Sequence, residues 1–205
     1  IDDLHDISAR HKFLLQIAAA LIMTMLGAVC VENLGDLFGL GQVHTGPLKV
    51  VFTVICVLGV INAINMEDGV DGLAGALTLV ACGWYALLAW WSGVVTIRGM
   101  ALLLAGSVAG FLLFNLRTPW RSRASVFMGD AGSMALGLLL TWFAVELSGQ
   151  PGSRVTPITA VWVLALPLID MASVMAQRMR QGVSPFQADH GHLHHALLLA
   201  GYSVS

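Results

Sequence analysis

Four short segments of the sequence bring together carboxylate, amide and imidazole side chains. The first is an acidic cluster, and the second contains two asparagines followed by two aspartates. The third reads Met-Gly-Asp-Ala-Gly-Ser, and the fourth contains four histidines. Side chains of these types can bind metal ions and phosphates. The segments span residues 2–6, 62–72, 128–133 and 189–195.

The first three segments contain side chains that suit a magnesium site. Carboxylate and amide oxygens are hard ligands, and Mg²⁺ usually binds one or two carboxylates together with the phosphates of a substrate. Mn²⁺ has a similar preference. An isolated acidic cluster such as Asp2, Asp3 and Asp6 is more often solvated or caps a helix. The presence of the other segments favours a metal site here.

Asp68-Gly69 and Gly129-Asp130 lie just before apolar stretches that we expect to be helices. A helix N-terminus carries a partial positive charge and unpaired backbone N–H groups, so it binds phosphate readily. Glycine allows close backbone approach there, although glycine beside a membrane helix also serves packing alone. The pattern favours a phosphate site over packing.

The histidine segment contains His190, His192, His194 and His195. Neutral imidazole binds zinc, but no cysteine lies nearby, and imidazole N–H groups donate equally well to diphosphate oxygens. We favour contact with an anion over zinc binding and over ordinary surface histidines.

The composition indicates a membrane protein. Hydrophobic residues make up 57% of the 205 residues and charged residues 11%, which is more apolar surface than a soluble domain of this length could bury. A membrane-crossing helix needs about 20 mostly apolar residues, and the runs lack the alternation of barrel strands. We predict an all-α polytopic fold that forms a single transmembrane catalytic domain over residues 1–205. The six predicted spans are Phe13–Val31, Leu48–Ile64, Leu73–Trp91, Met100–Leu116, Ser133–Leu147 and Val155–Ala176.

The ten lysines and arginines divide unequally between the two sides that six crossings create. Three of them, Lys49, Arg98 and Arg154, lie on one side. The other side holds the remaining seven, all four polar segments and both chain ends. By the positive-inside rule this side is cytoplasmic, so we expect a cytoplasmic active site. The seven are Arg10, Lys12, Arg117, Arg121, Arg123, Arg178 and Arg180.

Basic side chains on this side have two interpretations. Arg178 and Arg180 can form charge-assisted contacts with phosphate, or they can be ordinary positive-inside anchors. For Arg10, Lys12 and Arg121 we prefer the anchor.

Other features of the sequence carry less chemistry. Glu146 lies at the end of its apolar run and is assigned no role, whereas Asp170 lies about two turns from the cytoplasmic end of its run and is left open. The cysteines, Cys30, Cys56 and Cys82, lie in apolar runs and behave as small hydrophobic residues. A net charge of −2 argues against a nucleic-acid partner.

Taken in order, the segments resemble a known family. Asp-Asp-x-x-Asp, Asn-Ala-Ile-Asn-Met-x-Asp-Gly-Val-Asp-Gly-Leu, Phe-Met-Gly-Asp-Ala-Gly-Ser and His-x-His-Leu-His-His are similar to motifs of the polyprenyl-phosphate N-acetylhexosamine-1-phosphate transferases. The resemblance runs from Asp2 to Gly201, and the histidine pattern is typical of the bacterial N-acetylglucosaminyl branch rather than the muramoyl-pentapeptide branch.

The resemblance implies roles for individual residues. Mg²⁺ would be bound by Asp130, Asn65, Asp2 and Asp3. The catalytic carboxylates would be Asp2, Asp3, Asp68 and Asp71. The expected substrate contacts are Asn62, Asn65, Arg178, His192, His194 and His195.

The implied reaction transfers a sugar-1-phosphate, with N-acetylglucosamine-1-phosphate expected, from a UDP-sugar to undecaprenyl or another polyprenyl phosphate, with release of UMP. Such a reaction starts cell-envelope polysaccharide synthesis, including O-antigen, at the bacterial inner membrane. The oligomeric state stays open, with a homodimer as one arrangement. Family members have more membrane helices than six, and the chain opens without an initiator methionine or a leader. We therefore expect the chain to be an internal piece of a longer protein.

Two other classes of protein fit parts of the pattern. A transporter would use charged residues as an ion path, but it would place acidic groups near the membrane midplane rather than at helix ends. A membrane metalloprotease would need His-Glu-x-x-His on a helix, which the sequence lacks.

Overall fold

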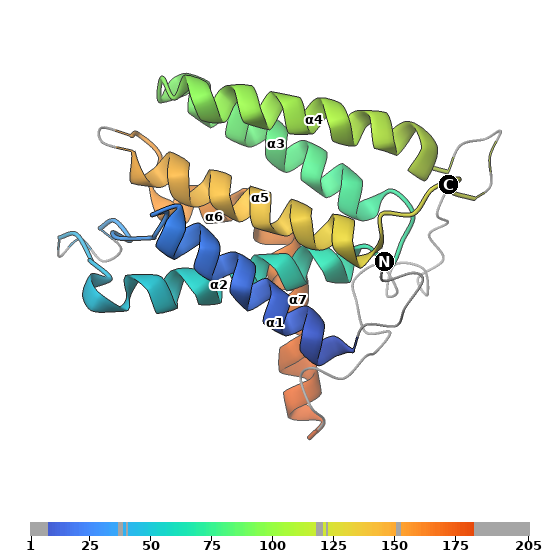
Figure 1. Cartoon of the computed structure of the whole chain (residues 1–205), viewed down its shortest axis with the longest axis horizontal. Coiled ribbons are helices and arrows are strands. Elements are labelled where there is room, and N and C mark those ends of the chain that lie inside the picture. Colours follow the sequence, from blue (N-terminus) through green and yellow to red (C-terminus); the bar gives the residue numbers. More distant parts are fainter. Residues whose placement is uncertain are drawn as a thin grey trace.

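The computed structural model describes residues 8–36, 39, 41–117, 121, 123–150 and 153–182. Within these ranges the protein is helical apart from isolated β-bridge residues, such as the pair Asn33 and His44, which confirms the all-α prediction. The helices are α1 (Ala9–Leu21), α2 (Lys49–Glu67), α3 (Leu73–Trp91), α4 (Val95–Asn115), α5 (Gly129–Gly149), α6 (Pro157–Trp162) and α7 (Ala165–Arg180) (Figure 1). A π-helical segment, Ile22–Leu26, extends α1, and a 3-10 turn, Gly46–Leu48, precedes α2.

Five helical segments in the described part of the chain are long and apolar enough to cross a membrane. They correspond to the first five predicted runs. Three of them extend further than predicted toward the polar segments, because α1 begins at Ala9, α2 continues to Glu67 and α5 begins at Gly129. Asn65 and Asp130 are therefore helical residues rather than loop residues. The five spans are Ala9–Leu26, Gly46–Glu67, Leu73–Trp91, Val95–Asn115 and Gly129–Gly149.

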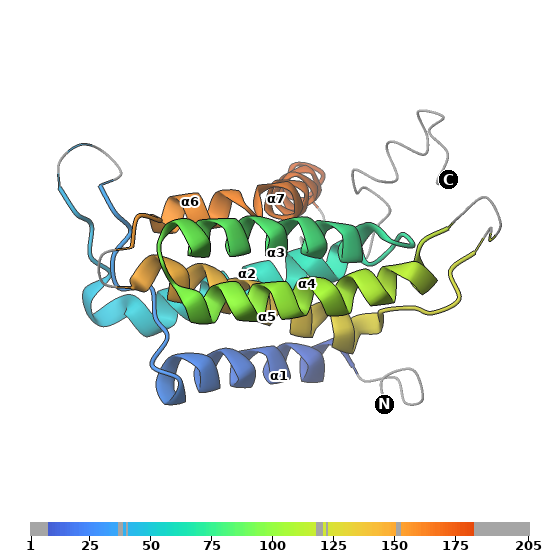
Figure 2. The ribbon, with the colours of Figure 1, turned by 90° about the horizontal axis from the view of Figure 1, so that it is seen from above.

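The sixth predicted run differs from a single crossing helix. It forms the short α6 and then α7, with the break at Val163 and Leu164. Pro167 explains the break, because proline lacks a backbone N–H and its ring clashes with the carbonyl four residues earlier, which here is that of Val163. As a result, α7 lies steeply across the other helices in Figure 1 and is seen nearly end-on in Figure 2.

Helix α5 lies at the centre of the bundle, with α3 and α4 on one side and α1 and α2 on the other (Figure 1). Phe143 of α5 packs edge-on against Tyr85 of α3, with ring centroids 6.2 Å apart. The Tyr85 hydroxyl donates to the carbonyl of Ala160 at 3.0 Å, which attaches α6 to the same core. This packing fixes α3, α5 and α6 relative to one another.

The bundle has two distinct ends. At the first, which we call the Asp130 end, α1 and α5 begin and α2 and α4 end. At the opposite end, Trp90 and Trp91 at the end of α3 are exposed, and tryptophan is enriched at membrane interfaces. The Arg154 guanidinium lies 5.7 Å from a ring centroid of Trp91 there.

Candidate active site

The Asp130 end is assembled by close contact between α2 and α5. A Cβ atom added to Gly137 of α5 would lie only 2.6 Å from the Cα of Ile61 on α2, so only glycine allows the two backbones to approach this closely. Small residues serve this purpose between membrane helices in general. The approach places Asn65, near the end of α2, beside Asp130, in the first turn of α5.

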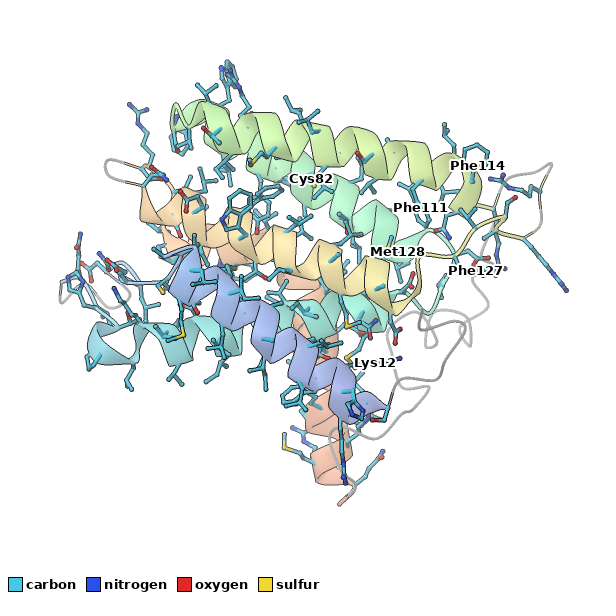
Figure 3. All side chains as sticks on the ribbon, in the orientation of Figure 1. Lys12, Cys82, Phe111, Phe114, Phe127 and Met128 are labelled. Atoms are coloured by element: carbon cyan, nitrogen blue, oxygen red, sulfur yellow. The ribbon has the colours of Figure 1, made fainter. Side chains whose placement is uncertain are left out.

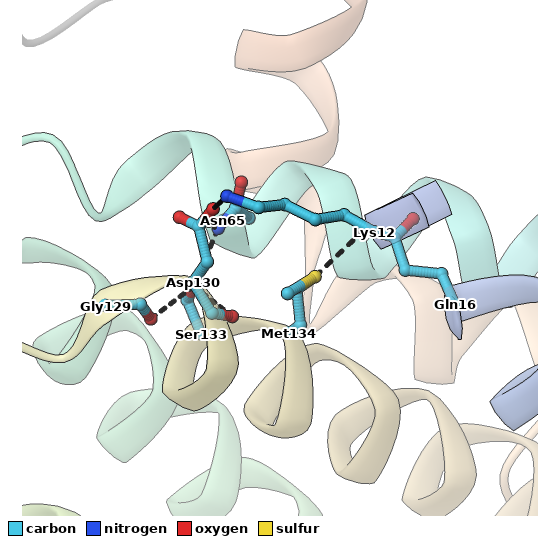
Figure 4. A network of polar contacts seen from close by, with 7 residues as sticks. All are labelled: Lys12, Gln16, Asn65, Gly129, Asp130, Ser133 and Met134. Atoms are coloured by element: carbon cyan, nitrogen blue, oxygen red, sulfur yellow. Dashed lines mark hydrogen bonds and ion pairs between the residues drawn. The ribbon is translucent and has the colours of Figure 1, made fainter. Parts of the chain in front are cut away.

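Asp130 is the centre of a polar network that joins three helices (Figure 4). The Asn65 Nδ2 group donates to Asp130 Oδ1 at 3.2 Å and to the Ser133 hydroxyl at 2.8 Å. Lys12 of α1 forms an ion pair with the other carboxylate oxygen, Oδ2. Ser133 in turn donates to the Gly129 carbonyl at 3.0 Å. The structure thus places a carboxylate, an amide and an ammonium group at one point.

Lys12 is the residue of this network that sequence reasoning interpreted as a membrane anchor. Its side chain and that of Asp130 are both partly exposed, at 26% and 37%, so the pair remains open to a ligand. Figure 3 shows Lys12 at the same end of the bundle as Met128 and Phe127, which precede Asp130. The closeness of Lys12 to the Asp2-Asp3 pair in the sequence could have suggested a role in the site. The direction in which the Lys12 side chain points, however, depends on how α1 packs against the other helices.

Asp68 connects the end of α2 to the start of α5. It follows the last residue of α2, and the backbone N–H of Gly129 at the start of α5 lies close enough to its carboxylate to favour the ionised form. Burial raises the pKa of Asp68 to about 6, and the nearby carboxylates of Asp130 and Asp71 also raise it, against the lowering effect of the Gly129 N–H. Asp68 therefore shares the electrostatic environment of Asp130. It does not lie at a helix N-terminus as expected, because α3 begins only at Leu73.

Asp71 is bound by the segment between α4 and α5. Its Oδ2 accepts from Arg117 Nε at 2.7 Å and from the backbone N–H of Ala124 at 3.4 Å. The Asp71 side chain is only 13% exposed. These contacts connect the α2–α3 turn to the segment that leads into Asp130.

Asn115, at the end of α4, is a second residue that sequence reasoning missed. Its Oδ1 accepts from the backbone N–H of Gly72 at 2.8 Å, and its Nδ2 donates to the carbonyl of Val126 at 2.8 Å. Gly72 has φ +85°, a left-handed conformation that suits glycine. Asn115 is 4% exposed, so one buried amide connects the turn between α2 and α3 to the segment that precedes α5. In the sequence, the only indication of this role was a single polar residue at the end of an apolar run.

The other predicted site residues lie deeper in the bundle, on α7 or outside the described residues. Asn62 donates to Gln16 Oε1 at 2.9 Å and to the Leu58 carbonyl at 2.7 Å, one helical turn deeper than Asn65. Arg178 of α7 is buried at 5% exposure. Asp170, on the same helix, is also buried and lies within electrostatic range of Glu67 at the end of α2. The residues that lie outside the described ranges are Asp2, Asp3, His192, His194 and His195.

The described donors fit magnesium better than a transition metal. No group of three or more His, Cys, Asp or Glu side chains in the described ranges could hold a metal ion by itself. Asp130 offers a carboxylate, and Asn65 offers its Oδ1 because its Nδ2 is the hydrogen-bond donor. One carboxylate and one amide oxygen match the way Mg²⁺ binds when substrate phosphates complete its coordination.

Membrane-length helices that converge on carboxylate, amide and ammonium groups at their ends define a multi-pass membrane protein with an interfacial polar site. Residues 1–148 match the model of glycosyl transferase family 4, and the chain belongs to this family.

Several relatives of known function are similar over nearly the whole chain. It is 34% identical over 203 residues to the undecaprenyl-phosphate alpha-N-acetylglucosaminyl 1-phosphate transferase of Escherichia coli strain K12, which covers 99% of this chain and 55% of the relative. It is 35% identical over 201 residues to the enzyme of the same name from Haemophilus influenzae, covering 98% of this chain and 57% of the relative. The chain thus spans about half the length of the relatives that it matches.

Proposed function

We propose that this chain forms the catalytic part of a bacterial inner-membrane enzyme that transfers N-acetylglucosamine-1-phosphate from UDP-N-acetylglucosamine to undecaprenyl phosphate. The observation that carries the proposal is the convergence of Asp130, Asn65 and Lys12, from three membrane-length helices, at one end of the bundle. The names of the relatives support the same donor group and the same lipid acceptor.

The reaction exchanges one phosphorus–oxygen bond for another. An oxygen of the lipid phosphate attacks the phosphorus that carries the sugar, and the bond from that phosphorus to UMP breaks, so UMP leaves with its oxygen. Catalysis of such a transfer requires positioning and neutralisation of charge more than covalent help. When bound, Mg²⁺ offsets the negative charge of the donor diphosphate.

Each residue of the network has a role in this proposal. Asp130 and the Asn65 Oδ1 would hold the metal ion, together with Asp2 and Asp3. Lys12 donates charge-assisted hydrogen bonds to a phosphate at the same position. Asp68 has a pKa of about 6, so it is ionised at neutral pH and can orient or deprotonate the lipid phosphate.

The proposal also assigns roles to residues outside the network of Lys12, Asn65 and Asp130. Asp71 organises the turn that contains Asp68 through its bond to Arg117. His192, His194 and His195 contact the diphosphate and the sugar of the donor, and Arg178 adds a cation from α7. The oligomeric state carries no part of this proposal.

The location follows from the two substrates. The polyprenyl tail stays in the bilayer, while its phosphate reaches the interface where α2 ends and α5 begins. Seven of the ten basic residues belong to the Asp130 end or its adjoining segments, so the positive-inside rule supports a cytoplasmic orientation for the site. The nucleotide sugar is then available on the same side.

The test is an assay of the purified protein at its full natural length, in nanodiscs that contain undecaprenyl phosphate. UDP-N-acetylglucosamine, UDP-N-acetylgalactosamine and UDP-N-acetylmuramoyl-pentapeptide are supplied in turn, with and without Mg²⁺. We expect UMP and a lipid diphospho-sugar only with Mg²⁺ and fastest with UDP-N-acetylglucosamine. UMP release without a lipid product, or no release with any donor, contradicts the proposal.

A further inference from the structure

A second polar layer lies one helical turn below the Asp130 network. Gln16 of α1 donates through Nε2 to the Met134 sulfur of α5 at 3.1 Å, and its Oε1 accepts from Asn62 of α2 at 2.9 Å. We call Lys12, Asn65 and Asp130 the outer layer, and Gln16, Asn62 and Met134 the inner layer.

The two layers are built from the same three helices. Each inner residue lies three or four positions from its outer counterpart, and this spacing places both on the same face of their helix. The rise between the layers is about 4.5–6 Å. Figure 4 shows Lys12 and Gln16 on α1, and Asp130 and Met134 on α5.

Helix α1 contacts the bundle through a narrow stripe of residues, so the inner layer makes up much of its attachment. The buried residues of α1 are Gln16 and Ala20, and the stripe continues with Thr24 in the π-helical segment. Leu14 and Leu15 beside Gln16 are more than 60% exposed in the described structure. Apolar contact in a bilayer gives helices little preference for one another, so packing and interhelical hydrogen bonds must supply it.

We infer that Gln16 and Asn62 are positioning residues, which fix α1 against α2 and α5 so that the Lys12 ammonium stays at the Asp130 carboxylate. The inference rests on the proposed function, in which Lys12 and the metal ion share that carboxylate. It also gives Asn62 a role inside the bundle instead of the substrate contact that the sequence suggested, because its amide N–H groups are directed to Gln16 and Leu58.

The first experiment exchanges the lengths of the two amide side chains in the full-length protein. Gln16→Asn shortens one partner by a methylene and Asn62→Gln lengthens the other, so each single variant breaks the contact and the double variant restores it. We expect each single change to lower kcat about threefold to tenfold, in line with the strength of interhelical hydrogen bonds, and the double variant to return to within about twofold of wild type. Double-variant activity no higher than that of the weaker single variant overturns the inference.

The second experiment measures binding of Mn²⁺ alone by electron paramagnetic resonance, so it needs no turnover. Lys12 opposes a divalent cation at Asp130, so Lys12→Met should tighten Mn²⁺ binding about tenfold. Gln16→Leu loosens Lys12 and should tighten binding about threefold, but it should have no effect when Lys12→Met is already present. Equal effects of Gln16→Leu in both backgrounds overturn the inference.

Thr53→Val is the matched control for both experiments. Thr53 of α2 also makes a buried hydrogen bond between segments, accepting from the Val31 N–H at 2.9 Å, but it lies at the opposite end of the bundle. We expect it to lower thermal stability without changing Mn²⁺ affinity. If Thr53→Val changed Mn²⁺ affinity as much as Gln16→Leu does, any destabilising substitution would alter the metal site. That result overturns the specific role of the inner layer.

A distance measurement tests the same geometry without metal or substrate. Nitroxide labels are attached at exposed Arg10 on α1 and exposed Leu103 on α4, after Cys30, Cys56 and Cys82 are replaced by alanine. Gln16→Leu should broaden the distribution of label distances, and an unchanged width overturns the inference. If the wild type transfers no sugar-phosphate, the proposed function fails while Mn²⁺ binding and the label distance still decide this inference.

Discussion

The Oδ1 atom of Asn115 accepts a hydrogen bond from the backbone N–H of Gly72, 43 residues away along the chain. The same side chain donates to the carbonyl of Val126, four residues before Asp130. A single amide at the end of α4 therefore fixes the position of the Asp68–Asp71 turn relative to the start of α5.

Asn115→Leu should destabilise the protein and slow the proposed reaction. It leaves the Gly72 N–H and the Val126 carbonyl without partners, and each buried unpaired group costs about 1–3 kcal/mol, so the free energy of unfolding should fall by about 2 kcal/mol or more. Thermal unfolding in detergent and the transfer assay measure the two effects. Asn33→Leu is the control, since Asn33 accepts from the Gly35 N–H at the opposite end; similar loss of activity in both variants would remove the specific role of Asn115.

Asp130→Asn should reduce turnover about hundredfold or more, because the loss of a metal-binding carboxylate removes several kcal/mol of charge stabilisation in the transition state. The concentration of Mg²⁺ needed for half-maximal activity should rise. The exposed Asp36, in the loop at the opposite end, provides the control variant Asp36→Asn. An unchanged Mg²⁺ response in Asp130→Asn would exclude Asp130 as a ligand.

Asp68→Asn should raise thermal stability at alkaline pH in the absence of metal. The pKa of Asp68 in the folded protein is about 6, above the ordinary aspartate value of about 3.9, so the folded state binds the proton more tightly than the unfolded chain. The stability gained from this proton is complete below about pH 4 and is lost as the pH rises through 6.

The advantage of Asp68→Asn, about 2–4 °C in Tm for each kcal/mol, should therefore be present at pH 8 and shrink toward pH 4. Melting curves across this range test it, with Asp36→Asn as the control. If the gain in Tm were equal at pH 8 and pH 4, ionisation of the Asp68 carboxylate would not destabilise the folded protein.

The orientation of the bundle can be measured by labelling single cysteines in spheroplasts and in inverted vesicles. After replacement of the native cysteines, Ser125→Cys at the Asp130 end should react only from the cytoplasmic side. Gln42→Cys, in the exposed loop of the opposite end, should react only from the outer side. The reverse pattern would place the site on the wrong side for a nucleotide sugar.

The histidine segment should bind an anion rather than zinc. His192→Ala, His194→Ala or His195→Ala should raise KM for the UDP-sugar and lower turnover, since N–H donors to the diphosphate are lost. A zinc-selective chelator should have no effect, because a histidine segment that binds an anion holds no zinc for the chelator to remove. Activity that chelation removes and Zn²⁺ but not Mg²⁺ restores would reverse the assignment, as would normal kinetics in all three variants.

The sequence by itself determined the all-α membrane fold, the first five spans and the family. These depend on local properties, namely apolar runs long enough to cross a bilayer and motifs that are contiguous along the chain. The break between α6 and α7 was also encoded locally by Pro167, although the length of the apolar run obscured it.

Only the tertiary structure decided which side chains meet. Lys12 and Asp130 are 118 residues apart, and their contact depends on how α1, α2 and α5 are rotated and how closely they approach. Gly137 sets the approach of α5 to α2, and Gln16 joins α1 to both of these helices by hydrogen bonds. Helical periodicity predicts which residues share a face, but the partner of that face depends on packing between distant segments, which no local pattern contains.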